Sequence, residues 1–223
     1  MKIKGAIFDC DGTLVNSLHF WDIFYNKISE RFFGGAPFSV ESADDKAMRT
    51  QPISFLASLL HEKYGVGDSP RAVADFTNEL FVWFYSEEVD LKAGVKELLS
   101  HLKKNGIPMC IATASEASLI RIALEKHGVM DCFGGIVDCS SVGRGKDAPD
   151  VFFAAEKFLG TPHGATWVFE DSLLAMQTAK SAGFPVVGIY DSHTFGQDTA
   201  RTLCDVYVDD GHSLDELIYK LEV

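Results

Sequence analysis

The sequence has few of the patterns that mark a metal or disulfide scaffold. Its five cysteines are an odd number and none forms a CxxC pair, which argues against a disulfide framework and a zinc ribbon. Its seven histidines show neither HxH nor HExxH spacing, so no histidine-based metal site is expected. A chain of 223 residues can instead bury a sizeable apolar core, as one large domain or as a domain with a smaller insertion.

Long apolar runs and an excess of positive charge are also missing. No run approaches the ~20 apolar residues of a membrane helix, and the opening MKIKGAIFDC reaches an aspartate too early for a signal peptide. We therefore expect a cytoplasmic protein without a membrane partner. A net charge of -12 argues against nucleic acid as a partner, although a bound cation would still allow a small phosphorylated substrate. No feature of the sequence indicates an oligomeric state.

From residue 90 onward, strand-like and helical stretches alternate. The strand-like runs are PMCIATA, GGIVDCS, TWVFED, PVVGIY and DVYVDD. This alternation predicts an α/β fold with a parallel sheet and helices on both faces. Several helices are expected to end at a glycine: Gly128, Gly160 and Gly183. The last helix is expected to begin with a capping box from Ser213 to Glu216.

Residues 15–89 follow a different pattern. LHFWDIFYNKISERFF, ISFLASLLHEKYG and AVADFTNELFVWFYSEE have helical periodicity, and no strand alternates with them. We predict an all-helical insertion over residues 15–89, with the α/β core formed by residues 1–14 and 90–223. The aromatic run LFVWFY is interpreted as part of the core of this insertion.

The stretch AIFDCDGTLV ends an apolar strand on two carboxylates. Side chains alternate along a strand, so Asp9 and Asp11 point to one side and Cys10 to the other, where we expect it to pack in the core. Gly12 permits a tight turn at the carboxyl end of the strand, where open parallel sheets bind ligands. Two such carboxylates repel by about 4 kcal/mol at an effective dielectric of ~20, so a cation or a proton is expected there. The alternative is a turn whose acids cap the next helix.

DCDGTLV resembles the first motif of the haloacid dehalogenase-like superfamily. CIATAS resembles its second motif, with Thr113 or else Ser115 as the hydroxyl residue, and GKDAPDVF resembles the third, with Lys146. VFEDSLLAMQTAKSAG resembles the fourth motif, with Glu170 and Asp171. The four motifs occur in order and span essentially all of the core. The resemblance implies a Rossmann-like core whose helical insertion is a cap domain that closes over the site and selects the substrate.

The resemblance also implies the roles of the core residues. Asp9 would attack phosphorus to form an aspartyl-phosphate, and Asp11 would be general acid and then general base. Thr113, or Ser115 in its place, would hold a phosphoryl oxygen, and Lys146 would neutralise that group together with Asp9. Outside the family context, Lys146 would be taken for a solvated loop lysine and Thr113 for a hydroxyl at a helix start.

A metal ion is expected at the same place. The resemblance implies that Mg²⁺ is held by Asp9, Asp171 and the backbone carbonyl of Asp11, with Glu170 binding directly or through water. Four carboxylates and Lys146 leave a formal charge of about -3, which would repel a phosphate dianion unless a divalent cation were bound. All the available ligands are oxygens, as Mg²⁺ prefers.

Within the family, the sequence favours a phosphatase of a small phosphorylated metabolite, for which a sugar phosphate is one candidate. A β-phosphoglucomutase is the alternative: its histidine four residues after the position of Ser17 is replaced by Trp21, although His19 is close by. Residues 72–91 also contain no lysine or arginine, unlike the mutase cap. The insertion residues that we expect to influence specificity are Ser17, His19, Trp21 and Arg49.

The sequence also contains features of two other functional classes. GRGKDA (Gly143–Ala148) fits a GxGxxA dinucleotide motif, but Asp147 would face the pyrophosphate and the carboxylate pair would have no role. A catalytically silent binding or regulatory protein is disfavoured because none of Asp9, Asp11, Lys146 and Asp171 is lost.

Overall fold

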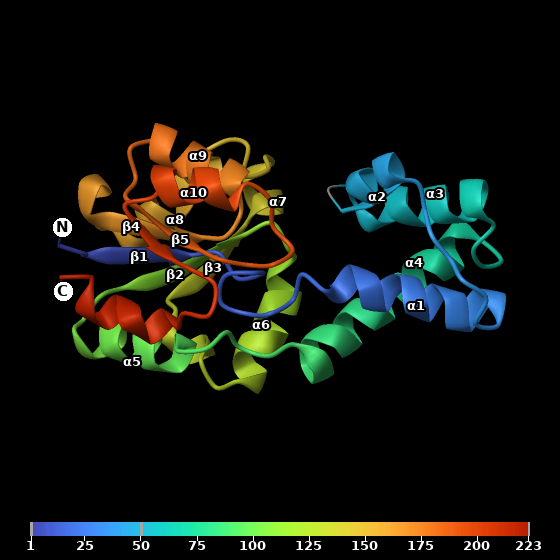
Figure 1. Cartoon of the computed structure of the whole chain (residues 1–223), viewed down its shortest axis with the longest axis horizontal. Helices are drawn as coiled ribbons and strands as arrows, with labels where there is room; N and C mark the ends of the chain where they lie inside the picture. Colours follow the sequence, from blue (N-terminus) through green and yellow to red (C-terminus); the bar gives the residue numbers. More distant parts are fainter. Residues whose placement is uncertain (1, 50, 223) are drawn as a thin grey trace. The chain divides into compact units, whose positions relative to one another are not determined.

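The computed structural model describes residues 2–49 and 51–222, which divide into two compact units. The core unit comprises Met1–Leu18 and Val89–Val223, and the helical unit comprises His19–Glu88 (Figure 1). The helical unit thus begins four residues after the start of the predicted insertion. In the described part of the chain, no helix has the length and apolar character needed to cross a bilayer.

The core unit is built on a parallel sheet of six strands in the order β3-β2-β1-β4-β5-β6. The strands are β1 (Gly5–Phe8), β2 (Met109–Thr113), β3 (Gly135–Asp138), β4 (Thr166–Glu170), β5 (Val186–Ile189) and β6 (Val206–Val208). Strand β1 lies between β2 and β4, with Phe8 opposite both Ile111 and Phe169. The strand order reverses at β1, and ligands of such sheets bind at the carboxyl ends beside this point. The sheet confirms the predicted α/β class.

Helices cover both faces of this sheet. They are α5 (Val95–Lys104), α6 (Ala117–Lys126), α7 (Cys139–Val142), α8 (Asp150–Leu159), α9 (Leu173–Ser181) and α10 (Gln197–Leu203), with 3-10 turns η2 (Met130–Cys132), η3 (His163–Ala165) and η4 (Leu214–Tyr219). In Figure 1, α8, α9 and α10 lie over one face and α5 and α6 over the other. Helix α8 ends at Gly160 in the left-handed conformation, as predicted. The expected last helix is a 3-10 turn, although its capping box from Ser213 to Glu216 is present.

Apolar packing fixes the strand ends that carry the acidic residues. On one face, Ile7 and Val168 belong to a buried cluster with residues of α8 and α9. On the other face, the rings of Phe8 and Phe169 stack with centroids 4.1 Å apart, a contact worth about 0.5–1.5 kcal/mol beyond burial. The amide of Asp9 also donates to the Phe169 carbonyl at 2.9 Å. The ends of β1 and β4 are therefore held side by side.

The helical unit contains α1 (Phe20–Phe33), α2 (Ser42–Met48), α3 (Ile53–Tyr64) and α4 (Pro70–Trp83), which continues as a π-helical turn, η1 (Phe84–Glu88). Among its described residues there is no strand. Helix α2 was not predicted, because it buries only Met48 and so has no apolar periodicity. The ring of Phe20 stacks on Phe81 at 4.3 Å, and Phe84 is fully buried, whereas Val82 of the same aromatic run is exposed.

The chain leaves and re-enters the core unit through two adjacent segments. Val15 forms an antiparallel bridge with Leu91. Two backbone hydrogen bonds of 2.9 Å flank this bridge: the Asn16 amide donates to the Asp90 carbonyl, and the Lys92 amide donates to the Leu14 carbonyl. Residues 15–18 therefore lie in the core unit.

Candidate active site

Three strands bring the predicted core residues to one edge of the sheet. Asp9 directly follows β1, Glu170 ends β4 and is followed by Asp171, and Thr113 ends β2. Because β1 pairs with both β2 and β4 in parallel, these ends lie together. Asp9, Thr113, Glu170 and Asp171 are all buried.

A tight turn after β1 places Asp11 next to this group. The Cys10 carbonyl accepts hydrogen bonds from the amides of Thr13, Leu14 and Val15 at 2.8–3.2 Å. Gly12 has a φ of +78°, and a Cβ on it would lie 2.5 Å from Oδ2 of Asp171. Only glycine allows the turn to approach Asp171 this closely.

Asp9, Glu170 and Asp171 form an acidic cluster with ligand oxygens within 4.8 Å of one another. Burial, followed by the carboxylates of Glu170 and Asp9, raises the pKa of Asp171 well above its ordinary value. Burial and the neighbouring Glu170 and Asp11 likewise raise the pKa of Asp9, in spite of an ion pair with Lys146. Bringing buried carboxylates this close is unfavourable unless a cation is shared, so the cluster fits a hard divalent metal ion.

Lys146 is the cation of the site. It lies in the loop between α7 and α8, and its Nζ donates to Oδ1 of Asp9 and, at 2.7 Å, to Oε2 of Glu170. Burial alone would lower the pKa of Lys146, but the carboxylates of Asp9 and Glu170 outweigh it and the pKa is raised. Lys146 therefore stays charged. Glu170 contacts this lysine as well as belonging to the acidic cluster, a contact that the sequence did not predict.

Hydroxyl groups hold the other acids. Thr13 Oγ1 donates to Oδ1 of Asp171 at 2.9 Å. The two oxygens of Asp11 accept from two serines: Ser17 Oγ lies 2.6 Å from Oδ1, and Ser115 Oγ lies 2.7 Å from Oδ2. Ser17 was predicted as a specificity residue of the insertion, whereas the structure places it in the core unit beside Asp11. None of these three contacts was predicted from the sequence. The one available signal was the presence of serine and threonine residues in and beside the first and second motifs.

Cys10 lies in the turn after β1 and is fully buried, as expected of a core residue. Burial and the carboxylates of Asp11 and Asp9 raise its pKa well above the ordinary value. A raised pKa favours the protonated thiol, which is a poor nucleophile.

The remaining predicted residues lie in the helical unit. The Arg49 guanidinium lies 4.9 Å from the centroid of the Trp21 ring, and its Nε donates to both carboxylate oxygens of Asp45 at 2.9 Å. The His19 ring packs edge-on against Phe84, with centroids 5.3 Å apart. A role of His19, Trp21 and Arg49 in specificity stays a prediction.

The GRGKDA stretch lacks the strand-turn-helix context of a dinucleotide site. The short helix α7 separates it from β3, and Gly143 caps the end of α7. Lys146 within it is directed to Asp9 and Glu170. The stretch therefore serves the acidic site.

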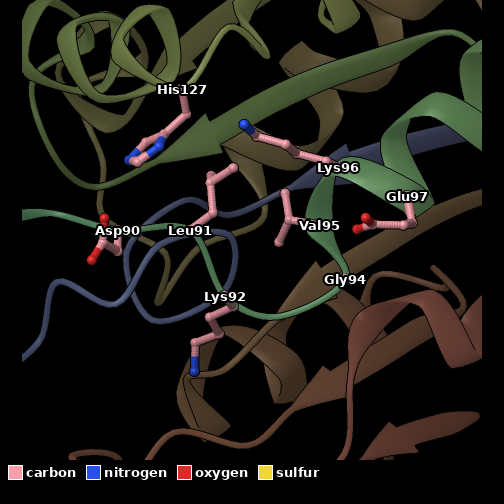
Figure 2. A pocket seen from close by; sticks show the side chains of 8 residues that line it. All are labelled: Asp90, Leu91, Lys92, Gly94, Val95, Lys96, Glu97 and His127. Atoms are coloured by element: carbon pink, nitrogen blue, oxygen red, sulfur yellow. The ribbon is translucent and has the colours of Figure 1, made fainter.

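A separate pocket of about 390 Å³ lies on the core unit beside the start of α5. Its lining residues are Asp90, Leu91, Lys92, Gly94, Val95, Lys96, Glu97 and His127 (Figure 2). Figure 2 shows the Lys96 side chain pointing toward His127, whose Nε2 lies 2.8 Å from the Val89 carbonyl oxygen. None of the candidate catalytic residues lines this pocket.

Known proteins resemble the chain over most of its length. Residues 3–183 match the family described as haloacid dehalogenase-like hydrolase. The chain is 30% identical to hexitol phosphatase A of Escherichia coli over 190 residues, covering 85% of this chain and 84% of that protein. It is 30% identical to (DL)-glycerol-3-phosphatase 2 of Arabidopsis thaliana over 221 residues, covering 93% of this chain and 89% of that protein.

The fold is also shared with solved structures. A CbbY variant from Rhodobacter sphaeroides, crystallised with xylulose-1,5-bisphosphate, superposes with a TM-score of 0.76 at 23% identity, covering 99% of this chain and all of that one. At this level of identity the likeness concerns the fold.

Proposed function

Because the chain belongs to the haloacid dehalogenase-like hydrolase family, we propose that it is a Mg²⁺-dependent phosphatase of a small phosphorylated metabolite. One observation carries the proposal: buried Asp9 lies in an acidic cluster with Asp171, is paired with Lys146, and stands two residues from Asp11. Relatives named as hexitol and glycerol phosphatases favour a polyol or sugar phosphate as the substrate class.

In the first step, a carboxylate oxygen of Asp9 attacks phosphorus. The bond between phosphorus and the ester oxygen breaks, and Asp11 donates its proton to that oxygen, which leaves as an alcohol. The product on the enzyme is an aspartyl-phosphate. Lys146 suits this step because its Nζ contacts Oδ1 of Asp9 and stays charged, which offsets the negative charge that builds up during transfer.

In the second step, Asp11 accepts a proton from water as the water oxygen attacks the same phosphorus. The bond between phosphorus and Asp9 breaks, which restores the Asp9 carboxylate and releases inorganic phosphate. The buried Thr113 at the end of β2 is the residue that would hold a phosphoryl oxygen throughout.

Asp9, Asp171 and the backbone carbonyl of Asp11 would hold Mg²⁺, with Glu170 within reach of the same position. A bound divalent ion would supply charge neutralisation for the phosphoryl group and the acidic cluster. The raised pKa values of Asp9 and Asp171 support such a site, because burial and the neighbouring carboxylates disfavour the charged forms and a shared divalent cation would favour them.

The helical unit is the candidate cap domain. In this proposal it selects the substrate, with His19, Trp21 and Arg49 as specificity residues. Arg49 pairs with Asp45 and lies over the ring of Trp21, and these two contacts restrict the orientations open to its guanidinium.

The test is release of inorganic phosphate from p-nitrophenyl phosphate and a panel of sugar, polyol and glycerol phosphates, with Mg²⁺ and with EDTA. We expect turnover only with Mg²⁺, none in Asp9→Asn, and a loss of about 10²- to 10⁴-fold in Asp11→Asn with unactivated esters. Asp131→Asn, at an exposed position of the core unit, is the matched control. Full activity in EDTA or in Asp9→Asn would refute the mechanism.

The same panel distinguishes the alternatives. Efficient conversion of β-glucose 1-phosphate to glucose 6-phosphate would identify a mutase, and binding without turnover of any ester would identify a silent binding protein.

A further inference from the structure

The carboxylate of Asp11 is held at both of its oxygens by hydroxyl groups. Ser17, in the segment that precedes the helical unit, donates to Oδ1 at 2.6 Å. Ser115 lies in the loop after β2, 104 positions after Asp11 in the sequence, and donates to Oδ2 at 2.7 Å. A single hydrogen bond leaves a carboxylate free to turn about that bond, whereas two bonds on different oxygens fix its plane.

Ser115 is itself oriented by the motif to which it belongs. Its amide donates to Oγ1 of Thr113 at 3.0 Å, and Thr113 is fully buried at the end of β2. The backbone at Ser115 is thus tied to the end of β2, which places its side chain within reach of Asp11. The bond from this hydroxyl in turn limits the rotamers open to Asp11, and a carboxyl group with fewer rotamers loses less conformational entropy on alignment with a reacting oxygen.

We propose that Ser115 is a positioning residue for Asp11, and that it aligns the carboxyl group for proton transfer instead of binding the phosphoryl group of the substrate. The inference rests on the proposed function of Asp11 as general acid and base. A serine hydroxyl has one proton to donate. In the structure Ser115 directs that proton to Oδ2 of Asp11, so at any one time the hydroxyl serves either Asp11 or a phosphoryl oxygen.

The two roles predict different kinetics. An alkoxide is a poor leaving group and needs the proton from Asp11, whereas p-nitrophenolate leaves without it. If Ser115 aligns Asp11, Ser115→Ala lowers kcat/KM for an alkyl phosphate such as glycerol 3-phosphate by about 10- to 100-fold and for p-nitrophenyl phosphate by less than about 3-fold. If Ser115 binds the phosphoryl group, both values fall by the same factor, which would overturn the proposal.

The second step gives an independent signal. Hydrolysis of the aspartyl-phosphate needs Asp11 as base for every substrate, while kcat/KM reports only the steps up to departure of the leaving group. With p-nitrophenyl phosphate, Ser115→Ala should therefore lower kcat more than kcat/KM and produce a burst of p-nitrophenolate. Absence of any change in kcat would contradict the proposal.

Two variants provide the controls. Ser115→Thr keeps the hydroxyl and should restore the wild-type ratio between the two substrates. Ser118→Ala removes an exposed hydroxyl three residues further along the chain, in α6, and should leave both substrates unaffected. Failure of Ser115→Thr to restore the ratio while the protein stays folded would count against the hydroxyl as the active feature.

Crystal structures of the wild type and of Ser115→Ala decide the question without turnover. We expect Oδ2 of Asp11 to be bound to Ser115 in the wild type and the carboxylate to be turned or disordered in the variant. An unchanged Asp11 in Ser115→Ala would overturn the inference. A wild-type enzyme that hydrolyses no phosphate ester would instead refute the proposed function, so the two failures are distinguishable.

Discussion

Thr13 donates a hydrogen bond from Oγ1 to Oδ1 of Asp171 across 158 positions of sequence, and the threonine is fully buried. This bond joins the turn after β1 to the end of β4. It also orients the carboxylate that we propose as a ligand of Mg²⁺, since one of its oxygens is committed to Thr13.

Thr13→Val should therefore weaken metal binding. The valine keeps the shape of the side chain but removes the donor, and loss of a group that orients a ligand lowers metal affinity by about 10- to 100-fold. Mg²⁺ titration by calorimetry measures the change. Thr13→Ser, which keeps the donor, should bind Mg²⁺ nearly as the wild type does; equal affinities in all three proteins would contradict the assigned role.

Mg²⁺ should stabilise the wild type but not Asp171→Asn. Binding at 100 times the dissociation constant adds about 2.7 kcal/mol to the free energy of unfolding. Asp171 has a raised pKa, chiefly from burial and then from Glu170, so its charge is unfavourable in metal-free protein. In EDTA, Asp171→Asn should therefore unfold at the same temperature as the wild type or higher. Thermal unfolding in EDTA and in Mg²⁺ measures both effects, and an equal Mg²⁺ response in the two proteins would rule out this ligand.

Lys92→Met should destabilise the core unit. Lys92 Nζ donates to Oδ2 of Asp191 and to the Tyr190 carbonyl, both at 2.8 Å, and the two charged side chains are only 11% and 7% exposed. Removing one partner of a buried pair costs about 3–5 kcal/mol, because the other charge stays buried. Urea unfolding measures the loss. Lys96→Met, at an exposed position of α5, should lower the free energy of unfolding far less.

The same pair predicts an acid-sensitive contribution to stability. Burial alone would raise the pKa of Asp191, but hydrogen bonds from Lys92 and from the His193 amide outweigh it and place the pKa below its ordinary value of 3.8. The unfolded state therefore binds this proton first as the pH falls. The stabilisation is fully present above pH 3.8 and is lost as the pH drops through the lowered pKa. Free energies of unfolding from pH 6 to pH 3 should fall more steeply in the wild type than in Asp191→Asn; parallel curves would refute the prediction.

Cys10→Ala should keep most of the activity. The thiol is fully buried, and burial together with the carboxylates of Asp11 and Asp9 raises its pKa, which favours the protonated form. The expected change is a loss of about 1 kcal/mol in stability from the smaller side chain. Phosphate release by the variant, and resistance of the wild-type enzyme to iodoacetamide, check this. Inactivation comparable to that of Asp9→Asn would show that the thiol takes part in the chemistry.

The strand ends could be predicted from the sequence because their signals are local. The apolar run AIFDCD places Asp9 directly after β1, and the apolar run TWVFED places Glu170 at the end of β4. Lys146 is different: a loop lysine has no local signal, and only the order of the four motifs identified it.

The hydroxyl contacts depend on the register between distant strands. Phe8 pairs with Ile111, and this register between β1 and β2 brings Ser115, after β2, next to Asp11, after β1. Serine and threonine are common in turns, so nothing in the residues themselves indicates such partners. Helix α10 was missed for another reason: it has seven residues, of which only Ala200 is buried, so it has no apolar face to detect.

The bridge between Val15 and Leu91 bears on how such a protein can change over evolutionary time. Entry to and exit from the helical unit are neighbours in a short antiparallel ladder, so the intervening segment spans a gap that one tight loop could close. The sheet, its register and the acidic cluster are all encoded outside that segment. An exchange or a change in length of the insertion at this one point would therefore leave the residues of the acidic cluster in place.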